Sequence, residues 1–317
     1  MITLADVKEA RERIGPLVHR TPLFGSATLS KMAGRPVYLK CENLQKTGSF
    51  KPRGALNNMM RLGPDERRRG VITISAGNHA QGVAWAASLL GIRAVVVMPA
   101  AASVTKAQAA RGYGAEVILH GEISETFRRM EEIREERGLV FIHPFDDDAT
   151  IAGQGTVGLE IFDDLPGVDT VVVGIGGGGL ISGVALAIKE SRPSVKVIGV
   201  EPTGAAVMHL SRRQGSPARL ERADTIADGL AAPFAGARNF EIVEKYVDDL
   251  VLVEDSEIRS AMRTLLERCK VLAEPAGAAA AAALLSGKIP PGSGGTTAIV
   301  VSGGNVALDT LAALIRA

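Results

Sequence analysis

The sequence predicts an α/β protein in which two separate series of alternating strands and helices each build a mostly parallel sheet flanked by helices. In the first series, the apolar run at residues 71–74 stops at a polar loop, and a helical pattern follows it. In the second series, the β-branched run at residues 171–173 stops at a glycine-rich loop and is again followed by a helical pattern. Because parallel strands need crossover connections, this alternation predicts a two-lobed α/β architecture.

Composition limits the functional classes that this chain can belong to. Its 317 residues are 46% hydrophobic, which is enough for a large core divided over two lobes. With 36 basic and 35 acidic residues the net charge is +1, so we expect no nucleic-acid partner and no membrane-surface partner. The two cysteines, Cys41 and Cys269, lack metal-ligand spacing. The N-terminus lacks the apolar core of a signal peptide, so a cytoplasmic protein is expected.

The first half of the chain predicts an N-terminal helix, a short strand and then a small inserted lobe. Val7, Ala10 and Ile14 have helical spacing within residues 3–15, and a short strand is expected at residues 37–40. The small lobe, residues 70–143, has predicted strands at 71–74, 94–98 and 116–119 and predicted helices at 81–90, 106–111 and 124–137. We expect residues 1–62 and 147–317 to form the large, cofactor-binding lobe around it.

The second half continues the large lobe. Strands are predicted at residues 171–173, 195–200, 250–253 and 297–301, and helices up to about 189 and at 256–270 and 276–285, whereas residues 204–224 are only weakly patterned. Residues 171–188 are uncharged and nearly long enough to span a membrane. Five of their first nine residues are glycine, however, which favours a strand, a loop and a helix over a membrane span.

Residues 46–55 read KTGSFKPRGA and contain the candidate reactive group, Lys51. Ser49 is the expected N-cap of a helix that begins near Phe50 or Lys51, and Pro52 suits the first helical turn. A lysine there lies at the positive end of the helix dipole, which favours the neutral amine that forms a Schiff base. The alternative for Lys51 is an ordinary solvated lysine.

The loop at residues 174–179 reads GIGGGG between a strand and a helix. Glycines at this point let backbone N–H groups converge on a phosphate at the positive end of a helix. The loop also fits the pattern G-x-G-x-x-G, with Glu201 at the end of the next strand, so a nicotinamide-dependent dehydrogenase is a competing hypothesis. A purely structural alternative is close packing of the strand against the helix.

Two more loops follow predicted strands and carry polar groups. Residues 75–79 read SAGNH and offer a hydroxyl and backbone donors to a carboxylate, although a turn with a helix cap would have the same composition. His79 is expected to be a structural hydrogen-bonding residue. Residues 302–305 read SGGN after the last strand. Three such loops at strand ends predict one shared crevice.

Taken together, these motifs resemble the serine/threonine dehydratase group of pyridoxal-phosphate enzymes, which includes serine racemase and has a fold similar to the tryptophan synthase β chain, fold type II. The resemblance extends from His19-Arg20-Thr21-Pro22 to residues 302–305. It implies that pyridoxal 5'-phosphate is held by Lys51 as a Schiff base beside Phe50, by Asn78 at its phenolic oxygen, by Gly176, Gly177, Gly178 and Gly179 at its phosphate and by Ser302 at its ring nitrogen. It further implies that Ser75, Ala76, Gly77 and Asn78 bind the substrate carboxylate.

The implied reaction is β-elimination of a 3-hydroxy amino acid, with L-threonine or L-serine giving 2-oxobutanoate or pyruvate plus ammonia. The neutral hydroxyl of Ser302 would leave the ring a weaker electron sink than a carboxylate would, which favours loss of a β-substituent. The alternatives are a serine racemase, a 3-hydroxyaspartate dehydratase, a nicotinamide-dependent dehydrogenase and a non-catalytic binding protein.

Three features distinguish this chain within the family that it resembles. Ala76 stands where racemases of the family carry a second serine, which favours a dehydratase. The family's cation site would use Glu201, the carbonyl of Ala205 and the side chain of Val207. Valine cannot ligate, so we predict no metal-ligating residues, and a divalent or monovalent cation stays an alternative that this substitution disfavours. The chain ends soon after its last motif, so no regulatory domain is expected. A homodimer or a higher homo-oligomer is what the resemblance implies.

Overall fold

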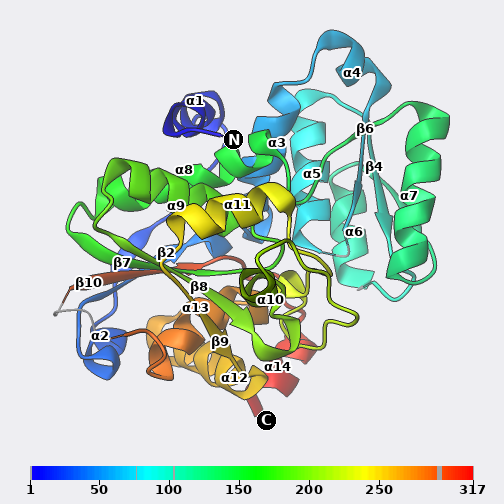
Figure 1. Ribbon diagram of the computed structural model, residues 1–317. Helices are drawn as coiled ribbons and strands as arrows, with labels where there is room; N and C mark the ends of the chain where they lie inside the picture. The colour runs from blue at the N-terminus through cyan, green and yellow to red at the C-terminus, as the bar shows by residue number, and fades with distance from the viewer. Residues whose placement is uncertain (1, 76, 103, 291–294, 317) are drawn as a thin grey trace.

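The computed structural model describes residues 2–75, 77–102, 104–290 and 295–316 and has two sheets, each flanked by helices. Figure 1 shows the larger sheet sandwiched between two helix layers, with the smaller sheet beside it. This arrangement confirms the predicted α/β class. The smaller sheet lies within residues 71–141, whereas the predicted domain boundaries at 62, 70, 143 and 147 stay a prediction.

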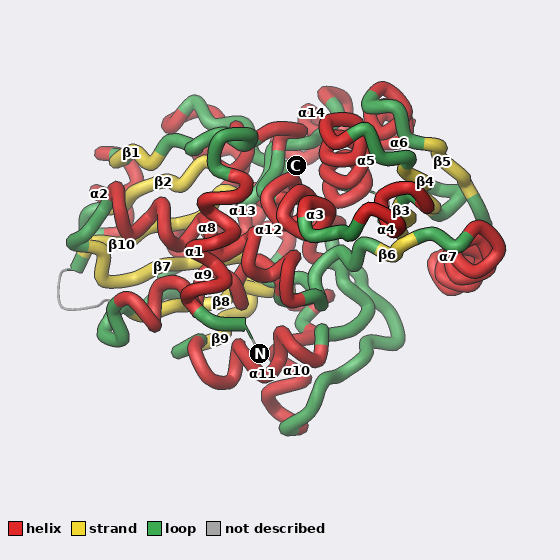
Figure 2. The backbone as a smooth tube through the Cα atoms, turned by 90° about the horizontal axis from the view of Figure 1, so that it is seen from above, coloured by secondary structure: helices red, strands yellow, loops and turns green. Residues whose placement is uncertain are grey.

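The larger sheet joins the N-terminal segment to the last strand of the chain. Its order is β1-β2-β10-β7-β8-β9, and every neighbouring pair is parallel except β1 with β2. The strands are β1 (Leu23–Gly25), β2 (Val37–Cys41), β10 (Thr296–Val301), β7 (Val168–Gly174), β8 (Lys196–Pro202) and β9 (Asp249–Val253). Figure 2 shows them side by side in this order. The pairing of β10 with both β2 and β7 brings the loops after these strands to one edge of the sheet.

Helices cover both faces of this sheet (Figure 1). On one face lie α1 (Leu4–Ile14), α8 (Asp148–Asp164), α9 (Gly179–Ser191) and α11 (Ala237–Tyr246), and α10 (Val207–Gln214) contacts α11. On the other face lie α2 (Ala27–Ala33), α12 (Asp255–Thr264), α13 (Pro275–Leu285) and α14 (Leu308–Arg316). With both faces covered, the central strands are mostly apolar and β-branched, as parallel strands usually are.

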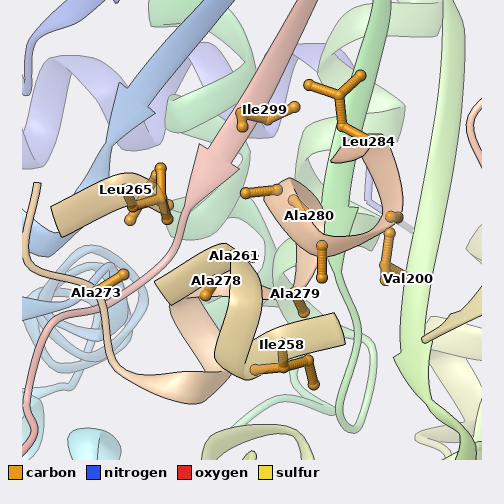
Figure 3. Packing of buried hydrophobic residues seen from close by; sticks show 14 of the residues in the cluster. Val200, Ile258, Ala261, Leu265, Ala273, Ala278, Ala279, Ala280, Leu284 and Ile299 are labelled. Carbon is orange, nitrogen blue, oxygen red and sulfur yellow. The ribbon is translucent and has the colours of Figure 1, made fainter. Parts of the chain in front are cut away.

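The alanine-rich helix α13 lies between the larger sheet and α12. Figure 3 shows Ala278 and Ala279 near Ala261 and Ile258 of α12 and Ala280 on the side of Ile299 of β10, and all six side chains are buried. Small side chains let the two helices and the sheet approach closely, so the composition reflects a packed core, as predicted. Within the described part of the chain, the structure has no helix of the length and apolarity that crossing a bilayer requires.

The smaller sheet is entirely parallel, with the order β5-β4-β3-β6. Its strands are β3 (Val71–Ile74), β4 (Ala94–Met98), β5 (Glu116–Leu119) and β6 (Val140–Phe141), and its helices are α5 (Asn78–Leu90), α6 (Val104–Gly112) and α7 (Ile123–Arg137). The short helices α3 (Lys51–Met60) and α4 (Pro64–Arg69) connect it to the larger sheet. The sheet places the end of β3 opposite the ends of β7 and β10.

The predicted N-cap at Ser49 is wrong. Helix α3 begins at Lys51, Phe50 occupies the N-cap position, and no side chain caps the helix. Ser49 is extended instead, and it forms an isolated antiparallel bridge with Gly303. The backbone of Ser49 thus joins the turn before Lys51 to the loop after β10. Capping rules consider only neighbouring residues, so they do not predict this contact. The Oγ of Ser49 is buried and has no hydrogen-bond partner among the described residues.

Two other parts of the chain differ from the local patterns. Residues 204–224, which are weakly patterned, contain α10, because the carboxylate of Glu201 caps this helix from the preceding strand. The predicted helix at 256–270 ends at Thr264 and continues as a π-helical turn, Leu265–Cys269. For α10, a contact with the preceding strand overrides the weak local signal.

A buried ion-pair network ties α3 to the rest of the larger lobe. The guanidinium of Arg53 donates to both oxygens of Glu42 at 2.8 Å and to both oxygens of Glu160 at 2.7 and 2.9 Å. Lys40 of β2 adds a 2.5 Å contact to Glu160. Burial raises the pKa of Glu42, but the charge of Arg53 outweighs burial and leaves that pKa below its ordinary value. The network therefore joins β2, α3 and α8 at their centre.

Arg53→Met should destabilise the fold strongly, because it leaves the charge of Glu42 buried without a cationic partner and that of Glu160 with Lys40 alone. We expect the free energy of unfolding in denaturant to fall by about 3–5 kcal/mol. Arg20→Met is the matched control: Arg20 pairs with Asp163 and Asp164 on the surface, where its side chain is 54% exposed, and should cost less than about 1 kcal/mol. Equal losses for the two variants would contradict this account.

Candidate active site

The three polar loops meet at one cavity of about 250 Å³ between the two sheets. It lies at the carboxyl ends of β3, β7 and β10, which is where parallel sheets place their ligands. All the site residues predicted from the sequence that the structure describes line this cavity, namely Phe50, Lys51, Ser75, Gly77, Asn78, Gly176, Gly177, Gly178, Gly179 and Ser302. Ala76 lies outside the described residues. The predicted shared crevice is confirmed, and the individual roles of its residues stay predictions.

Lys51 holds a free amine in the wall of this cavity. Its Nζ donates to the carbonyl of Pro144 at 2.9 Å and lies 5.1 Å from the centre of the Phe50 ring. Burial lowers the pKa of Lys51 to about 8, although the charge of Glu274 opposes that shift. From the sequence, the helix dipole is expected to favour the neutral amine of Lys51. In the structure, burial is the main cause of its lowered pKa. In both accounts, a larger share of this amine is unprotonated near neutral pH than in an ordinary lysine.

Hydrogen bonds between loops hold Lys51 in place. The backbone N–H of Phe50 donates to the carbonyl of Ser302 at 3.1 Å. The side-chain amide of Asn305 donates to the carbonyl of Thr47 at 2.7 Å and to Asn78 Oδ1 at 2.9 Å. The turn before Lys51, the loop after β3 and the loop after β10 therefore fix one another, and Asn305 is the residue common to all three.

The glycine loop can bind an anion, and it is also packed closely. The N–H groups of Gly176, Gly177 and Gly178 donate to no other described residue and lie at the start of α9, which suits a phosphate. A Cβ on Gly177 would come within 2.5 Å of the Phe145 ring, and one on Gly178 within 2.7 Å of Asn239 Cβ. Close packing therefore also requires glycine at positions 177 and 178, so the purely structural alternative holds for part of this loop.

Asn239 holds the carbonyl side of the glycine loop, so that its N–H groups remain available. The buried amide of Asn239 donates to the carbonyls of Gly177 and Phe145, both at 3.1 Å. The sequence analysis did not identify Asn239, because it lies on α11 and nothing in the local pattern there indicates a loop contact.

Glu274 is the second residue that the sequence analysis missed. Its Oε1 accepts a hydrogen bond from the side-chain amide of Asn78, and its buried Oε2 has no partner among the described residues. Burial raises the pKa of Glu274 to about 7, and the charge of Lys106 opposes that rise. A signal was present, because Glu274 is the sole charged residue between positions 271 and 287. The carboxyl group therefore titrates close to neutral pH beside Lys51.

Ser302 and three phenylalanines also line the cavity. The Ser302 hydroxyl donates to the carbonyl of Ala276 over a long distance of 3.4 Å, so its O–H is free to turn toward a stronger acceptor in the cavity. Phe127, Phe145 and Phe234 form an aromatic wall, with ring centres of Phe145 and Phe234 5.3 Å apart and those of Phe127 and Phe234 6.4 Å apart.

His79 has the structural role that the sequence predicts. It is buried on the first turn of α5, and its Nε2 contacts the carbonyl of Ile142 at 3.1 Å. Burial lowers the pKa of His79 well below its ordinary value. The imidazole is therefore neutral at physiological pH and joins α5 to the segment after β6.

The carboxylate of Glu201 caps the start of α10. Its two oxygens accept hydrogen bonds from the N–H groups of Met208 and His209, each at 2.7 Å, at the start of α10. Burial raises the pKa of Glu201 to about 7, and these hydrogen bonds oppose that rise. Among the described residues, no three acidic, histidine or cysteine side chains cluster as metal ligands do. This use of Glu201 counts against both a ribose-binding role and the family's cation site.

Comparisons with known proteins agree with this geometry. The family described as pyridoxal-phosphate dependent enzyme matches residues 14–303. The L-threonine ammonia-lyase of Thermotoga maritima is 51% identical over 317 residues, which cover 100% of this chain and 79% of that protein. Maize serine racemase has a TM-score of 0.94 at 41% identity, over 99% of this chain and 97% of that one. Threonine deaminase from T.th. has a TM-score of 0.92 at 41% identity, over 97% and 99% respectively. These likenesses confirm the predicted fold type.

The lowered pKa of Lys51 can be measured by its reaction with acetic anhydride, which attacks only unprotonated amines. In the protein freed of bound small molecules, we expect the labelling rate of Lys51 to rise through a midpoint near pH 8, because burial disfavours the charged form. The pKa of an ordinary lysine is about 10.4. Mass spectrometry of the labelled peptides gives both midpoints in one experiment, and an equal midpoint for Lys51 and the surface lysines would contradict the assignment.

Proposed function

Because this chain belongs to the family of pyridoxal-phosphate dependent enzymes, we propose that it is an ammonia-lyase that deaminates a 3-hydroxy amino acid by β-elimination. L-threonine and L-serine are the leading substrates, and the products would be 2-oxobutanoate or pyruvate plus ammonia. The observation that carries the proposal is the buried, readily deprotonated amine of Lys51, which shares one cavity with an anion-binding glycine loop. The names of the relatives, L-threonine ammonia-lyase and threonine deaminase, support the same reaction.

The residues present fit pyridoxal 5'-phosphate. Lys51 offers an amine to an aldehyde, Gly176, Gly177 and Gly178 offer unused N–H groups to a phosphate, and Ser302 offers a neutral hydroxyl to a ring nitrogen. Phe50 adds an apolar surface beside them, and Asn78 is oriented by Glu274 and Asn305. When bound, this cofactor withdraws electrons from the α-carbon of an amino acid and so makes its proton acidic.

The chain's own groups supply acid–base chemistry and orientation. When it is not bonded to the cofactor, the ε-amine of Lys51 would be the base that takes the proton from the α-carbon. Its lowered pKa makes the unprotonated form more accessible near neutral pH than in an ordinary lysine. The Ser75 hydroxyl accepts from the N–H of Gly77 at 3.1 Å, which shapes the loop that we propose binds the carboxylate. The aromatic wall of Phe127, Phe145 and Phe234 excludes water from the reacting atoms.

The use of Glu201 argues against the alternative of a nicotinamide-dependent dehydrogenase. In a dinucleotide-binding fold the acidic residue at the end of the second strand accepts hydrogen bonds from a ribose. Here both oxygens of Glu201 accept backbone N–H groups of α10. The G-x-G-x-x-G loop therefore suits a phosphate, but the acidic residue that would bind a ribose, Glu201, is occupied by α10.

We further propose that the enzyme is cytoplasmic and works as a homodimer or a larger homo-oligomer. Its balanced charge and two free cysteines support the compartment. The oligomeric state rests on the family resemblance, and sedimentation of the purified protein measures it directly.

The proposed function has a direct test with two variants. The purified protein should absorb visible light and convert L-threonine to 2-oxobutanoate and ammonia. Lys51→Ala should abolish the visible absorbance and reduce turnover by about 10²- to 10⁴-fold, because it removes both the cofactor's anchor and the base. Lys46→Ala, five residues away in the same motif, is the control and should keep both properties. Full turnover by Lys51→Ala would refute the assignment, and a coloured protein that is inert to L-threonine would point to another 3-hydroxy amino acid.

The enzyme should eliminate water from L-serine much faster than it racemises it. The side chain of Ala76 has no hydroxyl to exchange a proton with the opposite face of the α-carbon. We expect pyruvate to form at least about 10²-fold faster than D-serine, since that factor is typical of a single acid–base group. Chiral chromatography and a pyruvate assay on one reaction mixture measure the ratio, and Ala76→Ser should lower it. Comparable rates of the two products would contradict the role given to Ala76.

A further inference from the structure

Lys106 is a second cation in the cavity, and none of the roles described so far involves it. It lies on α6, beside the four-stranded sheet, and its side chain is only 14% exposed. Its Nζ forms a 2.5 Å ion pair with Asp228, which belongs to the segment after α10 and has a side chain that is 62% exposed. The cation therefore lies inside the cavity, and its counterion lies on the solvent side. The pair spans the two halves of the molecule.

The ammonium of Lys106 stands beside the loop that follows β3. A Cβ on Gly77 would lie 3.5 Å from Lys106 Nζ and 3.7 Å from its Cδ, so this loop and the ammonium line the same small region. Gly77 is the N-cap of α5, and no side chain occupies its capping position. A buried, unpartnered carboxylate oxygen of Glu274 lines the same cavity. The ammonium and the free helix start suit an anion, whereas the Glu274 oxygen is an acceptor and suits a donor.

We propose that Lys106 is a positioning residue that binds the α-carboxylate of the amino-acid substrate, and that Asp228 holds its ammonium in place. This inference rests on the proposed function, in which the substrate is an α-amino acid. The α-amine must reach the site of Lys51, and the α-carboxylate on the same carbon needs its own anchor in the cavity beside it. Lys106 and the N–H groups after Gly77 provide a charge and directed donors at one place.

A role for Lys106 in binding the cofactor phosphate fits the structure less well. The free N–H groups of Gly176, Gly177 and Gly178 lie after β7 of the six-stranded sheet. Lys106 belongs to the four-stranded sheet and is next to the loop after β3 instead. Cofactor retention therefore separates the two roles.

The first experiment compares Lys106→Met with Arg111→Met in the holoenzyme. Arg111 is on the same helix but is exposed outside the cavity, so its loss changes the net charge equally. Lys106→Met should raise the KM for L-threonine by about 10- to 100-fold, as expected for loss of one charged hydrogen bond, and should leave the visible absorbance unchanged. Arg111→Met should leave KM unchanged. Loss of the cofactor from Lys106→Met, or an unchanged KM, would overturn the proposal.

The second experiment measures binding of substrate analogues that cannot undergo β-elimination. L-2-aminobutyrate has no hydroxyl to lose, and its amide has no carboxylate; binding of both can be followed by the visible spectrum. Lys106→Met should weaken binding of the acid by the same factor and leave binding of the amide unchanged. Equal weakening of acid and amide would overturn the proposal. A wild-type enzyme that binds the acid through Lys106 but does not deaminate L-threonine would refute the proposed reaction and leave this inference intact.

The role of Asp228 is tested by combining variants. Asp228→Asn should raise KM by less than Lys106→Met does, because the ammonium remains but is less well oriented. The double variant should have the KM of Lys106→Met alone, since Asp228 acts only through Lys106. If the increase in KM of the double variant equals the product of the two single increases, Asp228 acts independently of Lys106. That result would overturn the role proposed for Asp228.

Discussion

The buried guanidinium of Arg53 is the constraint on which the rest of the site depends. It is enclosed by the carboxylates of Glu42 and Glu160, and none of the three groups can be removed without leaving an uncompensated charge in the interior. The network fixes α3 against β2 and α8, and Lys51 is on the first turn of that same helix. The orientation of the amine toward the cavity is therefore set by ion pairs that lie outside the cavity.

The site combines contributions from two sheets with different tasks. The six-stranded sheet supplies the glycine loop and Ser302, which are suited to a phosphorylated ring. The four-stranded sheet supplies the loop at residues 75–79 and Lys106, which are suited to the carboxylate of an amino acid. Asn305 links the two sets by bonding both Thr47 and Asn78. Because the reacting groups lie on different sheets, their geometry depends on how the two halves of the molecule meet.

The fold could be predicted well from the sequence wherever a strand or helix has a strong pattern of its own. The strands at residues 71–74, 94–98 and 116–119 have the predicted bounds, because each is a short apolar run that ends in a turn. Helix α10 could not be predicted, because its cap is the side chain of Glu201 on the strand before it. The cap at Ser49 failed for a related reason, since its backbone pairs with Gly303.

The sequence by itself determined the fold type, and it predicted that Lys51, Asn78, the glycine loop and Ser302 share one crevice, because each belongs to a motif that directly follows a strand or opens a helix. Only the tertiary structure decided which distant side chains complete the site. Glu274 is 196 positions from Asn78, and Lys106 is 122 positions from Asp228. Such pairs leave no spacing or periodicity in the sequence, since their contact is created by the docking of the two sheets. The structure likewise decided the state of Lys51, because burial, which no local motif encodes, is what lowers its pKa.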